Sequence, residues 1–91
     1  MIEVEHKLSG TQVYYGYLWW PPSENDKYRK VFPDGKFMLE IEGKRIPNRK
    51  VDWFKGRLFA GAYLKKIFVQ DEQVNISSHP NGIVVVRKLR S

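Results

Sequence analysis

The spacing of the turn signals is the feature that most constrains the fold of this chain. Clusters of Gly, Pro, Asn, Asp and Ser recur roughly every ten residues and mark turns. The segments between them are short and rich in β-branched and aromatic residues. This spacing is typical of an all-β domain. Because the chain has 91 residues, residues 1–91 are predicted to form a single small domain.

The clearest strand signal lies at residues 36–42. Phe37, Leu39 and Ile41 alternate with polar or less apolar residues, and Gly43 follows as a turn residue before Arg45 and Ile46, so this stretch predicts a β-hairpin. Other strands are predicted at 2–8, 11–20, 28–32, 57–60, 62–70, 73–77 and 83–89. We expect hairpins of 2–8 with 11–20 and of 67–70 with 73–77. Residues 83–89 are predicted to be a buried strand, which could pair with a second copy if it forms an exposed edge.

Residues 48–64 admit two interpretations. Asn48 could cap a helix, but Gly56 and Gly61 would each cost about 1 kcal/mol in a helix interior. We therefore predict a mostly antiparallel β fold, a strongly bent sheet or small barrel of SH3-like or OB-like size. It has room for one short helix around residues 48–56 and a bulge or bend at Gly61. The alternative is an α+β fold in which residues 48–64 form a helix across the sheet.

Composition excludes several classes of protein. The absence of cysteine excludes a disulfide framework, a cysteine-based zinc site and a thiol nucleophile. The acidic, alternating N-terminus does not resemble a signal peptide, and no apolar run approaches the roughly 18 residues of a membrane span. We expect an intracellular, cytoplasmic protein without a membrane partner. No nucleotide-binding motif is present, and the sequence predicts no metal and no cofactor.

Charge is unevenly distributed along the chain. The net charge is +6, but residues 1–26 carry −3, residues 27–67 carry +8 and residues 68–91 carry +1. A basic middle with an acidic start predicts an anionic partner, with nucleic acid first.

The segment from Lys44 to Lys66 concentrates this charge and interleaves it with aromatic residues. Cations neutralise phosphates, and aromatic rings stack on bases. The sequence therefore predicts a non-enzymatic nucleic-acid-binding module, with DNA favoured over RNA. The predicted binding residues are Arg45, Arg49, Lys50, Trp53, Lys55, Arg57, Lys65 and Lys66. The alternative is that these bases are only solubilising residues on strand edges.

A second aromatic segment covers residues 14–20. In a strand, Tyr17 and Trp19 would share one face, and Tyr14, Leu18 and Trp20 the other. One face must be core, and the other is either covered by a neighbouring segment or exposed. An exposed aromatic surface of Tyr14, Tyr17, Trp19 and Trp20 would suit a protein- or peptide-interaction module of the SH3 or Tudor type.

A third hypothesis comes from Pro33-Asp34 followed by Glu42-Gly43-Lys44. These residues resemble the PD-(D/E)xK motif of restriction enzymes and junction resolvases. That resemblance implies a Mg²⁺-dependent nuclease in which Asp34 and Glu42 hold the metal and Lys44 assists the attacking water. The two acids are closer in sequence than is usual for that family. Pro-Asp-Gly and Glu-Gly-Lys are more simply explained as two hairpin turns.

Overall fold

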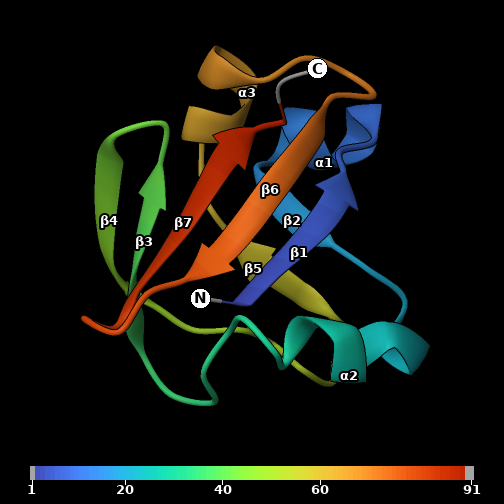
Figure 1. Ribbon diagram of the computed structural model, residues 1–91. Coiled ribbons are helices and arrows are strands. Elements are labelled where there is room, and N and C mark those ends of the chain that lie inside the picture. Colours follow the sequence, from blue (N-terminus) through green and yellow to red (C-terminus); the bar gives the residue numbers. More distant parts are fainter. Residues whose placement is uncertain (1, 90–91) are drawn as a thin grey trace.

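The protein is a two-layered, mostly β structure. A computed structural model describes residues 2–89. Strand accounts for 41% and helix for 20% of it, which confirms the predicted mostly β class. A five-stranded sheet forms one layer, and a two-stranded ribbon with short helices lies behind it (Figure 1).

The large sheet is open and mixed. Its strands, in spatial order, are β1 (Ile2–Lys7), β6 (Gln73–Ser78), β7 (Ile83–Lys88), β3 (Phe37–Ile41) and β4 (Lys44–Arg49). All neighbours are antiparallel except β3 and β7, which run parallel. Within residues 2–89 the sheet does not close on itself, so the predicted antiparallel barrel is replaced by an open sheet. The predicted buried strand at 83–89 is confirmed as β7, whose central residues are buried. It is not an exposed edge, because β7 lies between β6 and β3.

The predicted hairpin at 36–46 is confirmed as β3 and β4. Glu42 and Gly43 both adopt positive φ at its turn. The pairing shifts by one residue between Leu39–Ile46 and Phe37–Arg49. Asn48, with φ of 58°, supplies the extra residue of this bulge.

The second layer is built from the ribbon and the helices. β2 (Tyr17–Trp19) pairs antiparallel with β5 (Arg57–Phe59). The helical elements are α1 (Gly10–Tyr15), the short 3₁₀ helix η1 (Pro22–Glu24), α2 (Asn25–Tyr28) and α3 (Tyr63–Ile67). In Figure 1, α1 and α3 lie near one end of the ribbon and α2 near the other.

The predicted strand at 11–20 is wrong over its first half, which forms α1. Ser9 caps this helix by accepting a hydrogen bond from the Gln12 backbone N–H. Gly16 ends the helix in the left-handed conformation with φ of 79°. These caps outweigh the β-propensity of the aromatic residues. The predicted hairpin with 2–8 therefore does not form, and β1 pairs with β6 instead.

Other local predictions also differ from the structure. Residues 62–70 contain α3, and instead of a strand at 28–32, Tyr28 ends α2 and residues 29–32 form turns and a bend. Residues 48–56 contain no helix, because β4 ends there and Asp52 forms a bridge with Arg57. Gly61, predicted to lie at a bulge or bend, lies at a turn between β5 and α3 with φ of 80°. The expected hairpin of 67–70 with 73–77 is replaced by pairing of β6 with β1 and β7.

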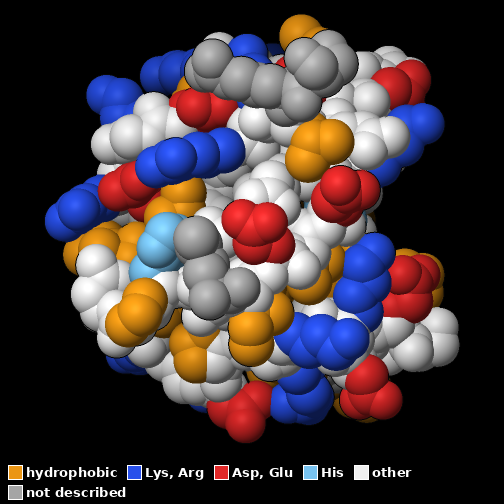
Figure 2. Space-filling model, viewed as in Figure 1, with side chains coloured by type: hydrophobic (Ala, Val, Ile, Leu, Met, Phe, Trp, Pro, Cys, Tyr) orange, Lys and Arg blue, Asp and Glu red, His pale blue; other side chains and the backbone are white. Residues whose placement is uncertain are grey.

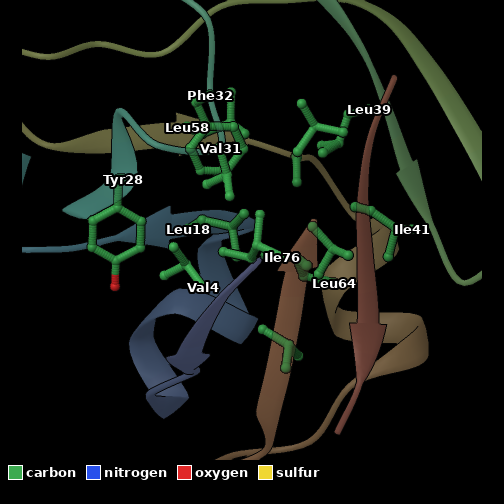
Figure 3. Close-up of a cluster of buried hydrophobic side chains, with 14 of the residues drawn as sticks. Val4, Leu18, Tyr28, Val31, Phe32, Leu39, Ile41, Leu58, Leu64 and Ile76 are labelled. Carbon is green, nitrogen blue, oxygen red and sulfur yellow. The ribbon is translucent and has the colours of Figure 1, made fainter. Parts of the chain in front are cut away.

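The hydrophobic core fills the space between the two layers (Figure 3). Leu39, Ile41 and Ile76 project from the large sheet, and Leu18 and Leu58 project from the ribbon. Trp20 lies in this core between the rings of Tyr28 and Phe32, at centroid distances of 4.1 and 5.7 Å. Burial of these apolar and aromatic side chains is the main force that holds the layers together.

A buried polar cluster around His6 connects β1 to the second layer. The Gln12 Oε1 atom accepts a hydrogen bond from the Trp19 backbone N–H at 3.0 Å, so it also acts as the acceptor for His6 Nε2–H at 2.7 Å. The unprotonated His6 Nδ1 then accepts from the Tyr28 hydroxyl at 2.6 Å. Burial lowers the pKa of His6 below 6.5 and raises the pKa of Tyr28 to about 12. The cluster is thus neutral and internally satisfied.

Replacing Gly16 with alanine is expected to destabilise the fold. A Cβ atom there would lie 2.4 Å from the carbonyl oxygen of Gly61, and the backbone would be strained at positive φ. Gly82→Ala is the matched control, because Gly82 has φ of +83° with nothing within 4 Å of the new atom. In urea unfolding, we expect Gly16→Ala to cost at least about 2 kcal/mol and Gly82→Ala about 1. Equal costs would contradict the close approach.

The His6 cluster predicts sensitivity to acid. Because the pKa of His6 is lower in the folded state, the unfolded state binds the proton first. The stability that His6 contributes is therefore complete above pH 6.5 and declines below it, by up to about 1.4 kcal/mol per pH unit. Urea unfolding over this pH range checks the decline. It should shrink in His6→Gln and persist in His79→Gln, and an unchanged decline in His6→Gln would contradict the assignment.

Candidate functional site

The outer side of the β2–β5 ribbon gathers aromatic and cationic side chains that are distant in sequence. Leu18 and Leu58 pair directly and face the core, so the residues on either side of them face outward. We call this surface the ribbon face. It consists of Tyr17 opposite Phe59 and Trp19 opposite Arg57.

The side chains of the ribbon face contact one another. The Tyr17 ring lies 5.6 Å from Trp19 and 5.0 Å from Phe59, measured between centroids. The Arg57 guanidinium lies over Tyr17 at 4.8 Å and over Trp19 at 5.9 Å. Cation–π contacts hold the guanidinium plane against the rings and leave its N–H groups to bind an anion. Among residues 2–89, no carboxylate forms an ion pair with Arg57.

Further cations flank the ribbon face. Arg49 ends β4, and its Nη1 approaches the Phe59 carbonyl oxygen at 3.5 Å. Lys50 follows it and is exposed, as is Lys55 in the loop before β5. The acid in this stretch, Asp52, accepts a hydrogen bond from the Lys55 backbone N–H through its carboxylate. The surroundings of the ribbon face are therefore predominantly positive.

The loop at 52–56 is held in one conformation. The Asp52 carbonyl oxygen accepts from the N–H groups of Gly56 and Arg57. Gly56 lies so close to the chain that a Cβ there would be 2.4 Å from the Trp20 carbonyl oxygen. Phe54 is left 90% exposed in this loop, outside the ribbon face as defined above.

The other predicted basic residues lie elsewhere. Arg45 pairs with Glu40 at 3.1 Å on the outer side of the large sheet. Lys65 in α3 lies over the Tyr14 ring of α1 at 4.8 Å, and Lys66 is exposed on the same helix. The structure thus brings Arg49, Lys50, Lys55 and Arg57 to one region, places Lys65 and Lys66 on α3, and separates Arg45 from both.

The predicted aromatic residues are divided between surface and core. Trp20 is only 4% exposed, and its Nε1–H donates to Asn25 Oδ1 at 2.8 Å. Trp53 is half-buried beside Trp20 and is covered by the Arg29 guanidinium at 4.3 Å. Tyr14 is exposed, but on α1. Of the four residues of the aromatic surface hypothesis, the ribbon face contains Tyr17 and Trp19.

The outer side of the large sheet has mixed charge. Figure 2 shows acidic and basic side chains intermingled on this side. A hollow here is lined by acids and bases together, including Glu3, Glu5, Arg87 and Lys88. Glu40 lies between Arg45 and Arg87, at 3.1 and 4.0 Å. This surface is a weaker candidate for a polyanion than the ribbon face.

The two acids of the nuclease hypothesis lie beyond opposite ends of β3. Asp34 precedes the strand and pairs with Arg29 at 2.6 Å. Glu42 follows it, and its Oε1 accepts from the Lys88 backbone N–H. A five-residue strand spans on the order of 15 Å, whereas ligands of one Mg²⁺ lie about 2 Å from the ion. Among residues 2–89, no three His, Cys, Asp or Glu residues form a group able to hold a metal.

Phe59 is the residue of the ribbon face that the sequence analysis did not select. It is 47% exposed and touches Tyr17 from the opposite strand. The alternation of Arg57, Leu58 and Phe59 mirrors that of Tyr17, Leu18 and Trp19. This shared pattern was the available signal, but it does not show that the two segments pair.

Comparison with known protein families, with curated protein sequences and with solved structures finds no match for this chain. Across residues 2–89, no helix has the length and apolar character needed to cross a membrane.

The neighbouring tryptophans Trp19 and Trp20 are expected to differ sharply in their effect on stability. Trp20 fills the core, so Trp20→Ala should cost about 3–5 kcal/mol. Trp19 lies on the half-buried ribbon face, so Trp19→Ala should cost about 1 kcal/mol. Urea unfolding of both variants checks this difference. Similar losses would mean that Trp19 is a structural residue.

Proposed function

We propose that the protein is a non-enzymatic nucleic-acid-binding module that uses the ribbon face. The observation that carries the proposal is that the Arg57 guanidinium lies against the rings of Tyr17 and Trp19. Among residues 2–89, no carboxylate pairs with it. A guanidinium held in this way can bind a phosphate while the rings beside it offer planar apolar contact.

The charge around the ribbon face favours nucleic acid over a peptide. Arg49 contacts the Phe59 carbonyl oxygen of the ribbon, the exposed Lys50 follows Arg49, and the exposed Lys55 lies two residues before Arg57. Asp52 accepts a hydrogen bond from the Lys55 backbone N–H. A polyanion with planar groups complements both the charge and the rings. The burial of Trp20 and the position of Tyr14 on α1 also leave the proposed peptide groove without two of its four aromatic residues.

The test is a binding titration that compares two double variants of equal charge loss. Arg49→Gln/Arg57→Gln removes two cations at the ribbon face, and Arg45→Gln/Arg87→Gln removes two beside Glu40. Labelled DNA and RNA, each single-stranded and duplex, are titrated at about 50 and 200 mM salt. We expect wild-type affinity to fall with salt. The ribbon variant should weaken binding and reduce the slope of log affinity against log salt by about 1–2, while the control changes little.

Two outcomes would contradict the proposal. If none of the nucleic acids binds at the lower salt concentration, a nucleic-acid-binding function is excluded. Equal weakening by both double variants would show that net charge, and not the ribbon face, determines affinity.

A further inference from the structure

The geometry of the ribbon face also distinguishes between forms of nucleic acid. Its rings present planar apolar surface, and Phe59 is about half exposed. A duplex hides the faces of its bases and offers phosphates and groove edges. Aromatic rings on a sheet surface are complemented by unpaired bases, which expose their faces.

The spacing of the rings points to the same form. The centroids of Tyr17 and Trp19 are 5.6 Å apart, and those of Tyr17 and Phe59 are 5.0 Å apart. Stacked bases in a duplex rise by about 3.4 Å per nucleotide. Bases that bind separate rings need not stack on one another, and an extended single strand allows this without loss of base pairing.

The polar groups of the ribbon face suit a ligand that is bound without recognition of its base sequence. The Arg57 guanidinium lies over the Tyr17 ring, and the Arg49 guanidinium donates to the carbonyl oxygens of Pro47 and Phe59. The remaining N–H groups of both can bind phosphates. Besides the Arg57 guanidinium, the outward side chains of the ribbon contribute one hydroxyl, on Tyr17, and the indole N–H of Trp19. With Arg57 and Arg49 assigned to phosphates, few groups are left that could form the paired hydrogen bonds by which bases are identified.

We infer that the ribbon face binds single-stranded nucleic acid without sequence preference, with bases against Trp19 and Phe59 and phosphates at Arg57 and Arg49. This inference rests on the proposed function, since it specifies the ligand of the same surface. Because the ribbon is held by Gly56 and by the core pair Leu18–Leu58, the rings are in place before the ligand arrives.

The test compares an oligothymidylate with a duplex of the same length, by fluorescence anisotropy at about 50 and 200 mM salt. We expect the wild-type protein to bind the single strand at least about tenfold more tightly than the duplex. Trp19→Leu and Phe59→Leu should each weaken single-strand binding about tenfold, leaving the salt dependence and duplex binding unchanged. A mixed-sequence single strand should bind the wild-type protein within about threefold of the oligothymidylate.

Tyr15→Leu is the matched control. Tyr15 is similarly exposed, but its ring lies on α1 and contacts Tyr14. It should leave single-strand affinity unchanged, and urea unfolding of each variant shows that it is folded. Duplex binding as tight as single-strand binding, or equal losses from Tyr15→Leu and Phe59→Leu, would overturn this inference and leave the proposed function intact. Failure to bind either ligand would overturn both.

Discussion

The arrangement of the two layers depends on the hydrogen bonds that meet at the Gln12 side chain. Its Oε1 atom accepts from His6 in the large sheet and from the Trp19 backbone in the ribbon. The partner of His6 on its other side is Tyr28, which stacks on Trp20. One neutral, buried cluster therefore sets the position of the ribbon relative to the sheet. Leaving any of its polar groups without a partner would cost about 1–3 kcal/mol, so the arrangement is well determined.

The same short strand contributes to both the core and the candidate site. Leu18 points inward and contributes to the packing between the layers, while Tyr17 and Trp19 point outward. Trp20, just after the strand, lies between Tyr28 and Phe32. The interior aromatic stack thus fixes the strand that presents the exterior rings. This coupling explains how a small domain can hold exposed aromatic side chains in defined positions.

Much of the large sheet could be predicted from the sequence, because the signals for its strands are local. Alternation at 2–7 and 37–41, and turn residues at 43 and 82, led to strands close to those observed. The signals that were missed were also local in part: Ser9 three residues before Gln12, and Gly16 beyond, are helix caps. Aromatic β-propensity suggested a strand there, but propensity is a weak guide where capping competes with it.

The sequence by itself determined the class of the protein, its strong positive charge in the middle and the residue types available for binding. Only the tertiary structure decided which of these residues come into contact. Trp19 and Arg57 lie opposite each other because β2 pairs with β5, although nearly forty residues of chain separate them. Arg45 lies away from the ribbon face because β4 places it beside Glu40. Such pairings depend on how the whole core packs, and no local pattern encodes them. The candidate site is for that reason a property of the folded chain.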